Sequence, residues 1–129
     1  MKKNTVVIVE MGLRDGLQNE KTVLDSDTRV EITKRLIAAG TKRLELGSFV
    51  SPKWVPQMAG TAEVVAKTFA LQKSGAISKK LEFSVLVPNE QGMLEAIQSG
   101  VKEVAIFAAC TESFSLKNIN CSIDESYPG

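Results

Sequence analysis

The sequence contains no histidine, and several features that mark common protein classes are scarce or absent. Without histidine, the chain cannot build a Ser-His or Cys-His nucleophilic pair from its own residues. Aromatic residues make up only 5% of the chain and the formal net charge is +1. A base-stacking platform and a basic surface for nucleic acid or membrane both need more than this. We therefore expect no nucleic-acid partner and no membrane partner.

Long apolar runs and cysteine motifs are absent as well. The apolar run at residues 6–9 ends at Glu10, which is too short for a signal-peptide core or a membrane span. The two cysteines, Cys110 and Cys121, fit neither a zinc motif nor a CxxC redox pair. Two isolated thiols are typical of a reducing compartment, so we expect a cytoplasmic protein.

The residues that are present predict one α/β domain. The chain has 129 residues, of which 43% are apolar, and this is enough for a sizeable core. Strand-like segments lie at residues 5–10, 43–47, 82–87 and 103–109, and the first is β-branched like a strand buried on both faces. Helical sequence runs from a cap at Ser26 or Asp27 to Gly40, over residues 62–72, and from the cap Asn89 to Gly100, and a capping box of Ser122 and Glu125 begins another helix.

Two helix-to-strand junctions share one pattern. Residues 39–46 (AGTKRLEL) and 99–106 (SGVKEVAI) each contain a helix end, a glycine, a lysine and a strand. Repeated junctions of this kind are typical of stacked βα units, which form a parallel sheet. The pattern alone leaves open a flavodoxin-like sheet and a piece of a (β/α)8 barrel. A full barrel needs about 250 residues, so this chain could supply only about half of one.

The loop after the first predicted strand carries candidate functional residues. Arg14 and Asp15 lie there between Gly12 and Gly16. In parallel α/β proteins the carboxyl ends of strands face the ligand. A carboxylate at this position can bind a hard cation such as Mg²⁺, and a guanidinium can stabilise an oxyanion. The alternative is an exposed ion pair in a turn, which contributes little.

Two further sites in the sequence support a ligand-binding edge. Glu45 lies within an otherwise apolar strand, where a buried carboxylate needs a partner such as Arg14 or a metal, unless it faces solvent on an edge strand. The loop at residues 48–57 contains two prolines and Trp54, the only tryptophan. Such a stiff loop could form a substrate wall, or Trp54 could simply cover the rim of the fold. Lys117, after the fourth predicted strand, could meet a phosphate or be solvated.

Three segments together resemble a known family. Residues 14–21 (RDGLQNEK) resemble the first signature of 3-hydroxy-3-methylglutaryl-CoA lyases, residues 48–58 the second and residues 117–122 (KNINCS) a third. The resemblance runs in order over nearly the whole chain. It implies that residues 1–129 form the first half, about four βα units, of a (β/α)8 TIM barrel, with the C-terminal half of the catalytic domain absent.

The resemblance also implies an activity and roles for individual residues. The family splits 3-hydroxy-3-methylglutaryl-CoA into acetyl-CoA and acetoacetate, a reaction of leucine degradation, with Mg²⁺ or Mn²⁺. Asp15 would be a metal ligand, and Arg14 would stabilise the enolate oxygen of the product. Glu45 would orient Arg14, while Gln18 and Ser48 would line the acyl-CoA pocket.

The sequence departs from the family pattern at several points. Leu13 stands where proline is frequent and Gly47 where threonine is common, but neither change removes a reacting group. The His-x-His metal pair, asparagine ligand and cysteine loop of the family's second half are missing, so we expect the isolated chain to be inactive. Two alternatives remain: a Claisen-type acyl-CoA synthase of the same superfamily, and a non-catalytic half-barrel. The bare edges at residues 5–10 and 103–109 would favour a homo-oligomer.

Overall fold

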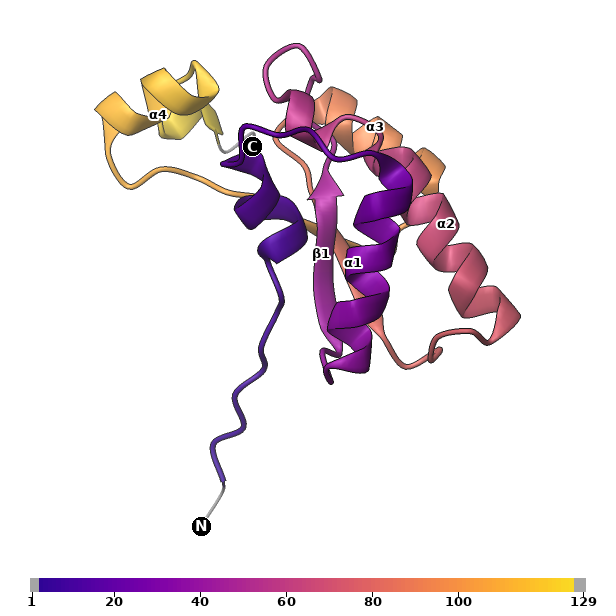
Figure 1. The fold of residues 1–129 in the computed structure, drawn as a ribbon. Helices are drawn as coiled ribbons and strands as arrows, with labels where there is room; N and C mark the ends of the chain where they lie inside the picture. Colours follow the sequence, from indigo (N-terminus) through magenta and orange to yellow (C-terminus); the bar gives the residue numbers. More distant parts are fainter. Residues whose placement is uncertain (1–2, 127–129) are drawn as a thin grey trace.

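The computed structural model describes residues 3–126 (Figure 1). Its helices and strands alternate along the chain, as in α/β proteins. In chain order they are η1 (Gly12–Gly16), α1 (Ser26–Ala38), β1 (Arg43–Ser48), η2 (Pro56–Met58), α2 (Thr61–Ser74), β2 (Glu82–Leu86), α3 (Glu90–Ser99), β3 (Glu103–Ala105), α4 (Glu112–Ile119) and η3 (Asp124–Ser126). Here η1 is a π-helical turn, whereas η2 and η3 are short 3-10 helices.

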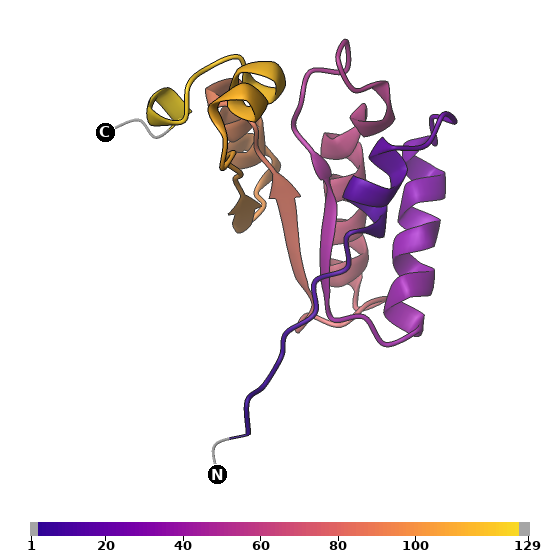
Figure 2. The ribbon, with the colours of Figure 1, turned by 90° about the vertical axis from the view of Figure 1, so that its left-hand side faces the viewer.

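The strands form one parallel sheet in the order β1-β2-β3. Figure 2 shows α1 and α2 together on one side of β1. The core lies between the sheet and these helices, where Phe69 of α2 also packs on Phe83 of β2 with ring centroids 6.2 Å apart. The buried apolar core is made by Leu13, Val30, Leu44, Leu46, Phe49, Val64, Val65, Phe83, Val85, Val87 and Ala96. The predicted parallel α/β architecture is therefore confirmed, but the described residues form three strands rather than four.

The segment at residues 5–10 does not form the buried strand that its β-branched run predicted. Val6 is 83% exposed and Ile8 77% exposed, and only Glu10 pairs, in an isolated bridge with Leu44. Counting back from that bridge in a parallel register places Val6 opposite Gly40, beyond the amino end of β1. Pairing on the other side would need a second neighbouring strand, and residues 3–126 supply none. The strand predicted at residues 5–10 is therefore wrong for the described chain, because β-branched residues form a strand only beside partners.

The fourth predicted strand is shorter than expected, and a helix follows it that was not predicted. Pairing covers only β3, because the chain leaves the sheet after Ala105, whose carbonyl accepts the last bond from the Val87 N–H at 2.9 Å. Helix α4 then begins at a cap by Thr111, whose hydroxyl accepts from the Phe114 N–H at 3.3 Å. The helix predicted from Ser122 appears within the described residues only as the short η3.

Most predicted helix ends are confirmed by their caps. Asn89 accepts the Gly92 N–H at 2.8 Å at the start of α3, and Gly100 ends that helix at φ 77°. The Ser122–Glu125 capping box also forms, with bonds of 2.8 and 3.1 Å. The cap of α1 is Asp25, not Ser26 or Asp27, because its carboxylate reaches the Thr28 N–H at 2.7 Å.

The Asp25 cap predicts a specific dependence of stability on pH. The backbone N–H of Thr28 stabilises the carboxylate and lowers the pKa of Asp25 below its ordinary value. A lowered folded-state pKa contributes stability above the unfolded-state pKa of about 3.9, and this contribution is lost as the pH falls through the folded-state value. Asp25→Ala should therefore lower the melting temperature at pH 7, and Asp25→Asn should lower it less, since asparagine is also a good cap.

Thermal melts followed by circular dichroism from pH 7 down to about pH 2 test this. The advantage of the unsubstituted chain over Asp25→Asn should shrink in the acid part of that range. Glu90→Gln is the matched control, because Glu90 lies in the first turn of α3 without capping that helix. A constant difference between Asp25→Asn and the unsubstituted chain at every pH would contradict the proposed cap ionisation.

Candidate functional site

The carboxyl end of β1 contains a β-bulge that changes which side chains face the site. Glu45 pairs with Ser84 but Ser48 pairs with Leu86, so β1 has one more residue than β2 across this stretch. Side chains alternate along a strand, and one inserted residue reverses that alternation. Glu45 and Ser48 therefore both face the site, although their spacing is odd. Gly47 lies on the helix side, where a Cβ would meet Thr61 of α2.

Arg14 and Glu45 form the most buried ion pair at this end of the sheet. Glu45 is 3% exposed, so the solvent-facing alternative for this residue is wrong. The Nε of Arg14 donates to Glu45 Oε1 at 2.7 Å. Arg14 reaches β1 because η1 is a tight turn closed by three N–H groups that converge on the Met11 carbonyl. The pair fixes the guanidinium plane above the sheet, as a carboxylate partner does when it orients an arginine.

Asp15 extends this pair into a chain of three charges. Its Oδ1 accepts from Arg14 Nη1 at 3.2 Å, and its side chain is 63% exposed. No described residue accepts a hydrogen bond from Arg14 Nη2, which leaves this donor for a ligand. Arg14, Asp15 and Glu45 are thus brought together as the sequence suggested, with Glu45 in the sheet and Asp15 at the surface.

The described residues alone do not offer a complete metal site. Among residues 3–126 no group of three or more His, Cys, Asp or Glu residues is placed to hold an ion. Asp15 fits one position of such a shell, because its carboxylate is exposed and only one of its oxygens is bonded to Arg14. A hard cation takes about six oxygen ligands, so the others would have to come from outside these residues or from solvent.

A cleft of 730 Å³ opens at the carboxyl ends of β1 and β2. Its lining comes from four parts of the chain: Gln18, then Ser48, Val50, Ser51, Trp54 and Val55, then Leu86, Pro88 and Asn89, and finally Phe107 and residues 116–120. The three segments that resemble family signatures therefore meet here. The cleft is not lined by the charged residues Arg14, Asp15 and Glu45. Gln18 does line it, and Gln18 follows Arg14 by one helical turn, so the charged residues lie next to the cleft along the chain.

Trp54 and the α4 segment form the walls of this carboxyl-end cleft. Trp54 is 81% exposed and lines the cleft, at the place where the sequence analysis expected either a substrate wall or a cover over the rim of the fold. Lys117 also lines the cleft, beside Asn120, which caps α4 at φ 54°. Sequence reasoning placed Lys117 near a ligand edge but missed Asn118 and Asn120. The available signal was Thr111, which can cap a helix that ends in the segment KNIN, so that residues 117–120 lie at its carboxyl end.

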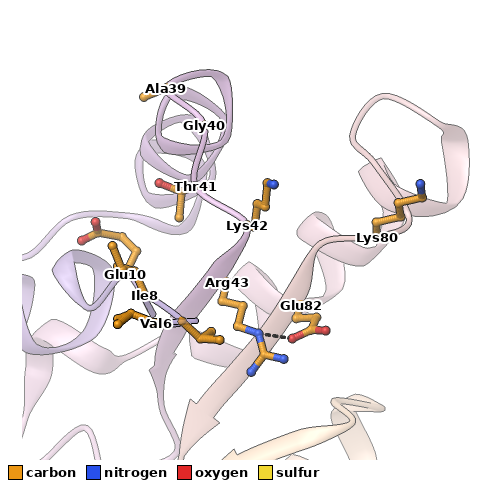
Figure 3. A pocket seen from close by; sticks show the side chains of 11 residues that line it. Val6, Ile8, Glu10, Ala39, Gly40, Thr41, Lys42, Arg43, Lys80 and Glu82 are labelled. Atoms are coloured by element: carbon orange, nitrogen blue, oxygen red, sulfur yellow. Dashed lines mark ion pairs between the residues drawn. The ribbon is translucent and has the colours of Figure 1, made fainter. Parts of the chain in front are cut away.

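A second cavity, of 610 Å³, lies at the opposite end of the sheet (Figure 3). It is lined by Val6 and Ile8 of the unpaired segment and by Arg43 and Glu82, which form an ion pair with each other. Ligands of parallel α/β folds bind at the carboxyl ends of the strands, not at the amino ends. This cavity is the space beside the unpaired N-terminal segment, and it carries no predicted site residue.

Comparison with known proteins identifies the family. Residues 5–128 match the HMGL-like family over nearly the whole chain. The chain belongs to the HMGL-like family. The 3-hydroxy-3-isohexenylglutaryl-CoA/hydroxy-methylglutaryl-CoA lyase of Pseudomonas aeruginosa is 51% identical over 121 residues, which cover 94% of this chain and 38% of that protein.

Solved structures of family members share the fold. The HMG-CoA lyase of Brucella melitensis is 43% identical with a TM-score of 0.79, over 94% of this chain and 40% of that one. An HMG-CoA lyase from Acinetobacter baumannii in complex with coenzyme A and 3-methylmalate is 30% identical with a TM-score of 0.79, over 93% and 37% of the two chains. This HMGL-like chain therefore has the fold of the first part of a TIM barrel, and spans about two fifths of its relatives' length. Residues 3–126 contain no helix that is long and apolar enough to cross a membrane.

Proposed function

We propose that this HMGL-like chain is the amino-terminal part of a lyase that cleaves 3-hydroxy-3-methylglutaryl-CoA into acetyl-CoA and acetoacetate. The observation that carries the proposal is the buried Arg14–Glu45 pair beside a cleft lined by Gln18 and Ser48. The relatives carry lyase names, and one was solved with coenzyme A. We also propose the cytoplasm as its compartment, since Cys110 and Cys121 are both free thiols.

The reaction makes one demand that Arg14 can meet. Breaking the bond between C2 and C3 turns the C3 alcohol into the ketone of acetoacetate, while the hydroxyl proton leaves to a base. The bonding electron pair passes to the acetyl-CoA portion as an enolate, which then takes up a proton at C2. Negative charge grows on the thioester oxygen in the transition state, where a fixed donor is most effective. Arg14 has a free Nη2 and a plane held by Glu45 for this role.

The remaining proposed residues bind and orient. Asp15 would supply one ligand to Mg²⁺ or Mn²⁺, which when bound would polarise substrate oxygen atoms. Ser48 Oγ donates to the Leu86 carbonyl at 3.2 Å, which fixes its position in the cleft wall. Gln18 lines the same cleft one turn beyond Arg14. A Claisen-type synthase of the same superfamily is the alternative activity. The lyase is favoured because the segment that contains Trp54 resembles the lyase signature.

The proposed lyase activity can be tested in a chimera that completes the barrel. Residues 1–129 would be fused to the remaining barrel of the Pseudomonas aeruginosa relative and assayed for both products. The assay should include 3-hydroxy-3-isohexenylglutaryl-CoA, because that relative's name includes it. Release of equal amounts of acetyl-CoA and acetoacetate supports the lyase. Condensation of an acyl-CoA with a keto acid, without cleavage, would support the synthase instead.

We further propose that the chain self-associates through its sheet edges. β3 is an edge strand, and Ile106 beyond it is 75% exposed. Val6 and Ile8 are also exposed on the unpaired segment at the other edge. Neither edge carries the proline or inward charge that usually prevents pairing. Burial is favourable by about 25 cal/mol per Å² of apolar surface, so two copies pairing segment 5–10 with the β3 edge would stabilise each other.

Light scattering at micromolar concentration should therefore show a dimer or a larger species. Ile8→Lys and Ile106→Lys should each shift the population toward monomer, because a charge at the edge opposes pairing. Ile97→Lys is the matched control, because Ile97 is also exposed but lies on helix α3 and not on a segment that could pair as a strand. A stable monomer for the unsubstituted chain, or equal dissociation by all three substitutions, would contradict edge pairing.

A further inference from the structure

Arg29 is a buried cation that the proposed chemistry does not use. It lies on α1, one turn before the buried Thr33, and it is 0% exposed. Burial lowers the pKa of its guanidinium. Among the described residues it forms no ion pair, and its Nε has no hydrogen-bond partner. A buried charge without a carboxylate is costly, so its remaining bonds must matter to the fold.

Those bonds join the end of the loop that carries Trp54 to strand β1. Arg29 Nη1 donates to the Ala59 carbonyl at 2.7 Å, and Nη2 donates to Thr61 Oγ1 at 3.2 Å. Nη2 also lies 3.4 Å from the Leu46 carbonyl of β1. Thr61 Oγ1 in turn donates to the Met58 carbonyl at 2.7 Å. Arg29 and Thr61 thus bind the last residues of the Trp54 loop, defined here as residues 49–59, to the end of β1.

Gly47 provides the space that this arrangement needs. A Cβ at this position would lie 2.7 Å from Arg29 Nη2 and 2.6 Å from Thr61 Oγ1, which is closer than real contacts allow. The bulge in β1 turns Gly47 toward the helices, so the guanidinium occupies the volume of the missing side chain. Arg29 and Gly47 therefore form a matched pair. The guanidinium leaves no room for a side chain at position 47, and a side chain at position 47 would displace the guanidinium.

The other parts of the Trp54 loop are also held. At its start, a Cβ on Gly92 of α3 would lie 2.4 Å from the Phe49 carbonyl, so the helix and loop backbones are in direct contact. In its later part, Gln57 Nε2 donates to the Glu20 carbonyl at 2.8 Å. Trp54 lies between these anchors and faces the carboxyl-end cleft. The position of the cleft wall is thus set by its anchors rather than by contacts of Trp54 itself.

We propose that Arg29 is a positioning residue that fixes the Trp54 loop as a rigid wall of the cleft, with Gly47 as its required counterpart. The functional meaning rests on the proposed lyase site, because the wall is assigned to the acyl-CoA pocket. The mechanical part stands on the hydrogen bonds and the close approach alone. Loss of the guanidinium should loosen the end of the loop before it unfolds the sheet.

Amide hydrogen exchange of the 129-residue chain tests this without substrate. The N–H groups of Met58 and Ala59 bond to Val55 and Pro56 carbonyls at 3.1 Å each and report on the loop. Arg29→Met keeps the aliphatic stem and removes the donors. It should speed exchange at these two amides by at least about tenfold, with little change in β2. Trp54 should also gain nanosecond motion, seen as a faster decay of fluorescence anisotropy.

Three further variants make the result specific. Arg35→Met is the matched control, because Arg35 lies on the same helix but is exposed and pairs with Glu31, and it should change neither readout. Arg29→Lys keeps one charged donor group and should give an intermediate exchange rate. Gly47→Ala should loosen the loop like Arg29→Met, and the double variant should show less than the product of the two single effects, because removing the guanidinium makes room for the Cβ.

Two outcomes would overturn the proposal. Equally faster amide exchange in the loop and in β2 would show that Arg29 stabilises the whole fold and not the loop in particular. If the effects of Arg29→Met and Gly47→Ala on exchange simply multiply in the double variant, the two residues do not act as a pair. If Arg29→Met does not fold, Arg29→Lys and Gly47→Ala carry the same test, and unchanged loop exchange in both would refute it. A failed lyase assay leaves these exchange rates untouched, so the two proposals can fail separately.

Discussion

By itself, the 129-residue chain should release no measurable acetoacetate from 3-hydroxy-3-methylglutaryl-CoA, even with Mg²⁺ or Mn²⁺. Asp15 offers one carboxylate to a cation that takes about six ligands. The chain has no histidine, and residues 3–126 hold no cluster that could complete the shell. Without a fixed metal and the rest of the substrate pocket, the rate should fall by roughly 10⁴-fold or more relative to a completed barrel.

The measurement is a coupled assay for acetoacetate at saturating metal, with the chimera of residues 1–129 and the Pseudomonas aeruginosa relative as the active reference. A mixture of the chain with the separate carboxyl-terminal part of that relative is the intermediate case. It should recover activity only if the edges at Glu10 and β3 can pair with the added strands. Acetoacetate production by the chain alone at a rate near that of the chimera would contradict the expectation, because Asp15 alone would then have to hold the metal.

The sequence predicted the elements whose stability is local. Helices α1 and α3 each combine a side-chain cap with a buried face, and α2 has a buried face without such a cap. The Asn89 cap and the Gly100 end are found where the pattern placed them. The segment at residues 5–10 failed because a strand depends on neighbours at other positions in the chain, and its apolar residues are the same whether or not those neighbours exist. β3 ended early for the same reason, since only its β2 side is paired.

The candidate site was also predictable only in part. A single carboxylate in an apolar strand needs a partner, so the Glu45–Arg14 pair could be anticipated from composition and chain position. The bulge that turns Ser48 into the cleft could not be anticipated from the sequence. One extra residue in a strand of six residues leaves too few positions to show a change in the side-chain alternation. Arg29 was missed because a charged residue within a helix is ordinarily solvated. Its only signal was its place on the inward face beside Thr33.

In the completed barrel, Arg14→Ala should lower kcat by about 10²-fold or more and change KM much less. Charge on the enolate oxygen develops mainly in the transition state, so a donor aimed at it contributes little to ground-state binding. Arg14→Lys should recover only part of the loss, because an ammonium group cannot bond Glu45 through Nε and present a second donor in the same plane. Steady-state kinetics of the three proteins, with the metal saturating, give the comparison.

Asp15→Ala in the same barrel is the informative companion to Arg14→Ala, because the two residues touch but have different proposed roles. It should weaken Mn²⁺ binding in a direct titration, whereas Arg14→Ala should leave Mn²⁺ affinity nearly unchanged. A wild-type kcat with a greatly raised KM in Arg14→Ala would assign the guanidinium to substrate binding instead of the enolate. Unchanged Mn²⁺ affinity in Asp15→Ala would remove that carboxylate from the metal site and leave it as the partner that, together with Glu45, holds Arg14 in place.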